Sequence, residues 1–371
     1  MKQSNNIEVF LDLIKAGLWE KEVWLSKYGE IDYDAIFQMA EEQTVVGLVT
    51  AGIEHVVDMK VPAEVKLQFA GRTLQIEQLN KAMNEFVAHL VELLRKNDVY
   101  TLLVKGQGIA QSYERPLWRM PGDVDLFMSK ENYYKAKTVL LPIATQIDGE
   151  DVSRLHLSMT IEGWVVELHG TLHGWIKRVD RVVDDVQKNI IYGGNVRSWM
   201  NGRTQVFLPA SDEDIFLVFT HILKHFYVVG IGLRQICDWC RLIWTYRDSI
   251  KSNLLEDRLK KAGVLTEWKA FSAFAVDYLG MPQENIPLYS DSNKWKKKAR
   301  IILKMVTESG NFGHGRDMSF KKNYPFMVRY TMSFWIYTKM ALEQFHISPM
   351  NTIPSWWALV KMGANAAAKK I

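Results

Sequence analysis

The sequence predicts an α+β protein in which a small mixed β-sheet lies between an N-terminal and a C-terminal helical region. Two observations predict this class. Apolar residues recur every three or four positions before about residue 99 and after about residue 210, the spacing of helices that bury one face. Between these limits lie short β-branched and aliphatic runs of strand length, separated by glycine turns. We therefore place the domains at 1–98, 99–209 and 210–371.

The composition agrees with a folded protein that has a sizeable core. Of the 371 residues, 48% are hydrophobic and 24% are charged, and the formal net charge is +4. This near balance of charge disfavours a long nucleic acid as partner. No run of about 18 apolar residues occurs, so no membrane span is expected. The N-terminus lacks a signal-peptide pattern and the chain has two cysteines, so we expect a cytoplasmic protein.

The N-terminal region predicts three helices. The first carries apolar residues at helical spacing from Ile7 to Leu18. The second is expected over Asp34–Ala51, and a long third helix over Ala63–Asn97. Each has one apolar stripe to bury.

At Val99 the pattern changes from helix to strand. Val99–Val104 is a β-branched and aliphatic run, and Lys105-Gly106-Gln107-Gly108 predicts a turn into a short helix over Ile109–Tyr113. A second strand is expected over Asp123–Met128. Ser129 is then expected to cap a helix that runs to about Leu141.

A hairpin is expected further along this central region. Its arms are Leu155–Ile161 and Trp164–Leu168, joined at Glu162-Gly163.

Helices return at Ser211. The run Ser211-Asp212-Glu213-Asp214 predicts a capped helix start with Ser211 as the N-cap. Cys237 and Cys240 lie in an apolar run, so we expect two buried side chains and neither a redox motif nor a zinc site. A glycine-rich loop is expected over 310–315. Further helices are expected over 232–247, 253–262, 268–279, 294–307 and 327–345, with a short stretch over 356–362.

Asp123 and Asp125 are the residues most indicative of chemistry. Alternate residues of a strand point to one face, so the two carboxylates are expected side by side. Such like charges repel unless a cation lies between them, and carboxylate oxygens suit Mg²⁺ or Mn²⁺. Glu167 interrupts an apolar strand and completes a three-carboxylate cluster if that strand lies beside the first. The alternative is an edge strand with two exposed aspartates.

Together these motifs resemble an uncharacterised nucleotidyltransferase family of the polymerase-beta-type superfamily. The resemblance covers about Val99–Trp239. The residues that carry it are Lys105-Gly106, Arg119, Asp123-x-Asp125-Leu126, Glu167-Leu168-His169, His221, His225 and Arg234-Gln235-x-Cys237-Asp238.

The resemblance implies a palm-like sheet on which Asp123, Asp125 and Glu167 hold Mg²⁺ or Mn²⁺ and an NTP binds beside them. The activity it implies is transfer of a nucleotidyl group to a hydroxyl acceptor, either a small molecule or a protein. No serine follows the glycine turn, so the alternative is a catalytically degenerate nucleotide-binding or scaffolding protein of the same fold. The residues expected to contact nucleotide or phosphate are Lys105, Gly106, Gln107, Gly108, Arg119, His169, His225, Arg234 and Asp238.

Several of these residues have a structural alternative. Arg119 either reaches phosphate or pairs with Asp123. Arg234 and Asp238, at i and i+4, either face the nucleotide or form an ion pair with each other. The histidine pair at 221 and 225 has the same spacing and either contributes to the nucleotide site or belongs to a polar seam between helices.

Overall fold

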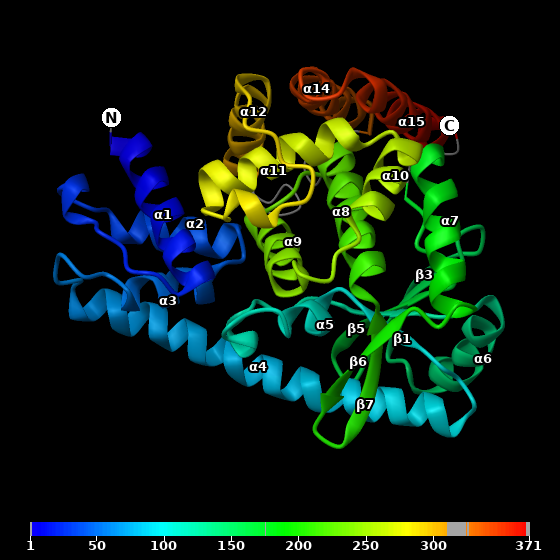
Figure 1. Ribbon diagram of the computed structural model, residues 1–371. Helices are drawn as coiled ribbons and strands as arrows, with labels where there is room; N and C mark the ends of the chain where they lie inside the picture. The colour runs from blue at the N-terminus through cyan, green and yellow to red at the C-terminus, as the bar shows by residue number, and fades with distance from the viewer. Residues whose placement is uncertain (1, 175, 310–323, 325, 369–371) are drawn as a thin grey trace.

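A seven-stranded mixed sheet lies between helices in the computed structural model, as the sequence predicts for an α+β protein (Figure 1). The structure describes residues 2–174, 176–309, 324 and 326–368, so the expected loop over 310–315 lies outside the described residues. The strand order is β3-β4-β5-β2-β1-β7-β6. The strands are β1 (Leu102–Val104), β2 (Val124–Phe127), β3 (Gln146–Asp151), β4 (His156–Ile161), β5 (Trp164–His169), β6 (Val196–Asn201) and β7 (Thr204–Pro209).

Helices make up the regions before and after the sheet and also cover its faces. The N-terminal helices are α1 (Lys2–Trp19), α2 (Tyr33–Glu42), α3 (Val46–Glu54) and α4 (Ala63–Lys96). Those within the central region are α5 (Gly106–Ala110), α6 (Lys130–Leu140) and α7 (Lys177–Ile191). The C-terminal helices are α8 (Ser211–Val228), α9 (Leu233–Tyr246), α10 (Ser252–Ala262), α11 (Leu265–Leu279), α12 (Asn293–Ser309), α14 (Phe326–Phe345) and α15 (Pro349–Ala368).

Two pairs of strands run parallel, β2 with β5 and β1 with β7, and the other neighbours are antiparallel. The expected hairpin is formed by β4 and β5. Glu162 and Gly163 at its turn both have positive φ, 50° and 83°, the backbone of a tight two-residue turn. Ser129 accepts a hydrogen bond from the Asn132 amide and caps α6 as expected.

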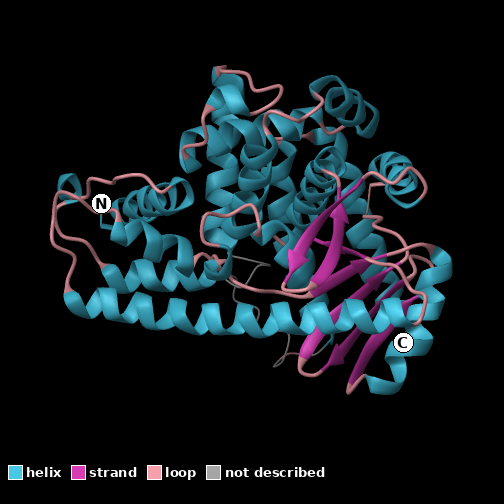
Figure 2. Cartoon of the chain, turned by 60° about the horizontal axis from the view of Figure 1, so that its bottom comes forward, coloured by secondary structure: helices cyan, strands magenta, loops and turns pink. Residues whose placement is uncertain are grey.

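The two faces of the sheet differ in what covers them. Leu126, Val166 and Leu168 pack in one core with residues of α4 and α6, and Figure 2 shows the long α4 running across this side. Phe127 belongs to the other core, together with residues of α8 and α9. Since side chains alternate along a strand, Asp125 and Glu167 point to the α8 side.

Four local expectations are wrong or incomplete. The helix expected over Asp34–Ala51 is two helices, because the chain turns at Thr44, whose φ is +55°. Ala210, and not Ser211, is the N-cap of α8. Asp123 lies just before β2 and is exposed. Strands β3, β6 and β7 and helix α7 were not expected at all.

The N-terminal and C-terminal helices share one hydrophobic core. Residues of α1 to α4 and of α8 to α12 belong to the same buried cluster. The Gln43 side chain donates to the Val306 carbonyl and accepts from the Leu233 amide, both at 2.9 Å. The Trp19 indole donates to the Leu279 carbonyl at 2.6 Å. The two helical regions therefore support each other and flank the sheet as one body.

Within the described part of the chain, every helix is too short or too polar to cross a lipid bilayer.

Candidate functional site

The centre of the site is the parallel pair of strands β2 and β5. Their register places Asp125 directly beside Glu167, so both carboxylates leave the sheet on the same side. His169, two residues after Glu167 on the same face, lies between them. Its Nε2 atom is 2.9 Å from Asp125 Oδ1 and 3.3 Å from Glu167 Oε2. The fold therefore brings together an acid and a histidine from two strands that are about forty residues apart.

Hydrogen bonds fix the charge of this centre. Burial opposes ionisation of Glu167, but hydrogen bonds from His156 and His169 outweigh it and hold the pKa of Glu167 far below its ordinary value. Burial also opposes protonation of His169, yet contacts with Asp125 and Glu167 raise its pKa. These hydrogen bonds therefore favour the ionised form of Glu167.

Asp123 lies at the exposed end of the same face. Partial desolvation and the negative charges of Asp125 and Glu167 raise the pKa of Asp123. The three carboxylates therefore repel one another, and the repulsion is incompletely compensated by nearby cations. Such an arrangement favours the binding of a cation.

A second possible ligand set shares Glu167. Ligand atoms of His156, Glu167 and His169 all lie within 4.8 Å of one another. Two imidazoles and one carboxylate suit transition-metal ions, whereas the aspartates suit Mg²⁺ or Mn²⁺. The sequence places His156 and His169 on the two arms of the predicted hairpin, where each either bonds a carboxylate, binds phosphate or is structural; the β4–β5 register sets His156 opposite His169.

Lys105 enters the site from the end of β1. Its Nζ atom is 2.6 Å from Asp125 Oδ1, and its backbone has φ +61°, an uncommon conformation for a residue other than glycine. Gly106 also has positive φ, +44°, and a Cβ atom there would lie 3.3 Å from the Asp123 carbonyl oxygen. The turn at Lys105-Gly106 therefore adopts an uncommon backbone conformation and lies directly against the loop that carries Asp123.

The next two residues of this turn serve packing. The Gln107 side chain is buried and donates to Asn80 and Asn84 of α4, so it points away from the carboxylates. A Cβ atom on Gly108 would lie 2.7 Å from the Leu208 side chain of β7. Only their backbones remain as candidates for contact with phosphate.

Arg119 pairs with Asp238 and not with Asp123. Its guanidinium makes two hydrogen bonds to that carboxylate, at 2.7 and 2.8 Å, and both side chains are about 6% exposed. Tyr113 donates to the same carboxylate at 2.8 Å. The expected Arg234–Asp238 ion pair is not formed; Arg234 donates to the carbonyls of Met120 and Pro121. These groups hold the loop that leads to Asp123.

His221 and His225 pair with each other on α8. Their Nε2 atoms are 3.0 Å apart. Burial and nearby positive charges lower the pKa of both, that of His225 to about 3. Burial therefore favours the neutral form of both imidazoles, and Lys224, which lies between them in the sequence, lines a cavity.

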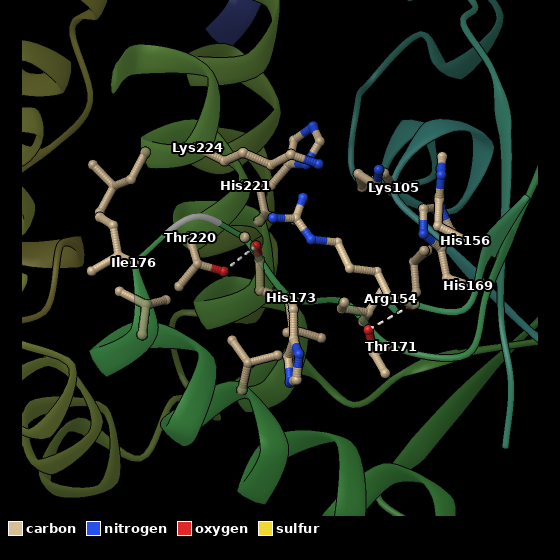
Figure 3. A pocket seen from close by; sticks show the side chains of 18 of the residues that line it. Lys105, Arg154, His156, His169, Thr171, His173, Ile176, Thr220, His221 and Lys224 are labelled. Carbon is tan, nitrogen blue, oxygen red and sulfur yellow. Dashed lines mark hydrogen bonds between the residues drawn. The ribbon is translucent and has the colours of Figure 1, made fainter. Parts of the chain in front are cut away.

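This cavity, of about 240 Å³, opens beside His169, the residue that contacts Asp125 and Glu167 (Figure 3). Lys105, His156 and His169 form its wall toward the sheet, while α7 and α8 form the opposite wall. Arg154 and His173, which no sequence pattern singled out, also line it. Both lie in connecting segments whose sequence shows no pattern that would place them beside the carboxylates.

The comparisons with known proteins give one match. A search of curated proteins and a search of solved structures find nothing significantly similar to the chain. A family model described as "Uncharacterised nucleotidyltransferase" matches residues 29–280, which include all of the sheet and both aspartates. Because this match spans more than half of the sequence, the chain belongs to the uncharacterised nucleotidyltransferase family.

Proposed function

We propose that this protein is a metal-dependent nucleotidyltransferase that moves a nucleotidyl group from an NTP to a hydroxyl acceptor. The observation that carries the proposal is the register of β2 and β5, which sets Asp125 directly beside Glu167, while Asp123 lies two residues before Asp125 in the chain. Family membership supports the reaction class. Mg²⁺ or Mn²⁺ is the cation proposed, with Asp123, Asp125 and Glu167 as ligands.

The residues fit such a cation. Carboxylate oxygens are the ligands that Mg²⁺ and Mn²⁺ prefer, and the raised pKa of Asp123 reports negative charge that a cation would balance. When bound, the cation supplies charge neutralisation to the triphosphate and favours ionisation of a coordinated hydroxyl.

The chain's own groups position the reactants. Lys105 and the backbone at Gly106 face the triphosphate, and Arg234 with the Arg119–Asp238 pair holds the loop that carries Asp123. In the reaction the acceptor oxygen forms a bond to the α-phosphorus, and the bond from that phosphorus to the β-phosphate oxygen breaks. Pyrophosphate leaves, and the hydroxyl proton passes to solvent. Catalysis then rests on alignment and charge neutralisation.

A specific observation favours a second candidate, a degenerate family member that binds nucleotide without turnover. Lys105 already neutralises Asp125 at 2.6 Å, where a metal ligand needs its oxygen available. No serine follows the glycine turn to contact phosphate. This candidate predicts magnesium-dependent NTP binding with no group transfer.

Label transfer separates the two candidates. The protein is incubated with each α-³²P-labelled NTP, Mg²⁺ or Mn²⁺, and the small-molecule or protein fraction of a cell extract. We expect one NTP to label an acceptor with the wild type and with Asp185→Asn, an exposed α7 control, but not with Asp123→Asn/Asp125→Asn. Labelling of an acceptor by the double variant contradicts the enzyme proposal. If the wild type binds an NTP but labels no acceptor, the enzyme proposal is also contradicted and the degenerate candidate is supported.

A further inference from the structure

The cavity beside the carboxylates has two chemically different parts. On its side toward the sheet the cavity carries the nitrogen-bearing side chains of Lys105, Arg154, His156, His169 and His173, and Lys224 adds a further nitrogen from α8. Its far wall is apolar and is built by Ile176, Val179, Val183, Leu217, Val218 and Leu223. A ligand that fills it needs an anionic group and a small apolar portion.

Lys224 is the strongest sign of an anionic ligand. It forms no ion pair with any residue that the structure describes, although it is half-buried. Burial and the charge of Lys105 lower its pKa, since two ammonium groups face one cavity. A desolvated cation without a carboxylate partner costs stability, and a bound anion removes that cost.

None of the described acids forms an ion pair with Lys224; Asp125 and Glu167 act on it electrostatically but are engaged by Lys105, His156 and His169. Asp214 is engaged by Arg197, and Asp184 accepts from His173 at 2.6 Å. Asp151 is exposed, and its carboxylate oxygen lies 3.7 Å from Arg154 Nε. Figure 3 shows Arg154 and Lys224 extending into the same space from the β3–β4 turn and from α8.

The cavity lies on the acceptor side of the proposed site. The turn at Lys105-Gly106, proposed for the triphosphate, belongs to β1 and α5, whereas the cavity continues past His169 into the segment after β5 and toward α7. Lys105 lines the cavity as well, so the turn and the cavity adjoin each other near His169. A molecule held in the cavity presents its near end to the carboxylates.

We propose that this cavity binds the phosphate group of a small phosphorylated molecule, and that this molecule is the nucleotidyl acceptor. Arg154 and Lys224 take the phosphate, since a guanidinium fork with an ammonium matches a dianionic tetrahedral group better than a singly charged carboxylate. The carbon skeleton packs on the apolar wall, and a hydroxyl on it reaches the carboxylates. The acceptor assignment rests on the proposed function; the phosphate site does not.

The test measures binding of inorganic phosphate by equilibrium dialysis of the full chain in EDTA, which removes divalent cations as a competing route. We expect the wild type to bind phosphate and to bind acetate at least tenfold more weakly. Lys224→Met is expected to weaken phosphate binding at least tenfold, and Lys224→Arg less than threefold. Lys188→Met, an exposed α7 lysine, serves as the control and is expected to bind as the wild type does. The proposed phosphate site is overturned if the wild type binds no phosphate, or if Lys224→Met binds phosphate as tightly as the wild type.

Titration with MgATP separates this proposal from the proposed function. Unchanged MgATP affinity in Lys224→Met supports an acceptor cavity distinct from the nucleotide. An equal loss of MgATP and phosphate affinity overturns the acceptor assignment, because the cavity then holds the nucleotide's own phosphates. If MgATP binds neither protein while phosphate binding depends on Lys224, the proposed function fails and the phosphate site stands.

Discussion

At the scale of single residues, the site is a balance of charges set by a few contacts. Asp125 is shared by Lys105 at 2.6 Å and His169 at 2.9 Å, while Glu167 is held by His156 and His169. Asp123 has no comparable partner within the described residues, and the neighbouring acids raise its pKa. The metal-free protein therefore carries an electrostatic cost at Asp123.

Asp123→Asn is expected to stabilise the metal-free protein. A carboxyl whose folded pKa is raised loses stability as pH rises through that pKa, so the cost is present at neutral pH and absent in acid. In EDTA at pH 7 the variant's Tm should exceed that of the wild type, and the difference should shrink toward pH 4. In excess Mg²⁺ the Tm of the wild type should exceed that of the variant. A variant that is less stable in EDTA, while Asp185→Asn is neutral, contradicts this balance.

His225 predicts a second pH dependence. Its folded pKa of about 3 lies below the unfolded value of about 6.5, so only the unfolded chain takes up a proton between these values. Stability is therefore lost as pH falls below about 6.5, by about 1–2 kcal/mol at pH 5. Urea unfolding at pH 7 and pH 5 should show a smaller loss for His225→Gln than for the wild type or for His89→Gln, an exposed control. An equal loss of stability between pH 7 and pH 5 in all three proteins would contradict the role given to His225.

At the scale of elements, the loop between α5 and β2 is held by a buried ion pair from a distant helix. Arg119 and Asp238 are both buried, and Arg234 on the same helix α9 binds the loop's carbonyls. Removing one partner of such a pair leaves a buried charge unpaired, which typically costs about 3–5 kcal/mol.

Asp238→Asn is accordingly expected to destabilise the protein by about 3 kcal/mol in urea unfolding. Asp257→Asn, which breaks an exposed ion pair with Lys261, should cost under about 1 kcal/mol. The double variant Arg119→Met/Asp238→Leu should be more stable than Asp238→Asn alone. Additive losses in the double variant would show that the pair is not coupled.

The elements also show where sequence reasoning succeeds. Short apolar runs bounded by glycine turns predicted β2 and the β4–β5 hairpin. The shared face of Asp125 and Glu167 was predicted only on the condition that β2 and β5 are neighbours, which the structure shows. Strand β3 is exposed along its whole length and β6 is an exposed edge, so neither carries the alternation by which strands are recognised. The Arg119–Asp238 pair and the place of Arg154 depend on contacts between distant segments, which local patterns do not encode.

At the scale of the whole molecule, the helices before and after the sheet form one core. The Gln43 side chain hydrogen-bonds to Leu233 at the start of α9 and to Val306 of α12, which links both helices to the N-terminal helices. The two cysteines lie fully buried on α9 within that core. A core shared by both ends of the chain favours cooperative unfolding.

The buried thiols of Cys237 and Cys240 allow the cooperativity of unfolding to be tested. During urea unfolding, their reaction with a thiol reagent should begin at the same urea concentration as the loss of far-UV circular dichroism. Gln43→Ala should shift both transitions together to lower urea, by about 1–3 kcal/mol, since it leaves two buried backbone groups unpaired. Thiols that react well before the sheet signal is lost would indicate separate units.

The most direct test of the account is a titration of Mn²⁺ followed by electron paramagnetic resonance, with and without ATP. The wild type and Asp185→Asn should bind Mn²⁺, more tightly with ATP, while Asp125→Asn and Glu167→Gln should each bind it at least tenfold more weakly and remain folded. Mn²⁺ affinity that is unchanged in both Asp125→Asn and Glu167→Gln would contradict the claim that carboxylates of β2 and β5 hold a shared cation.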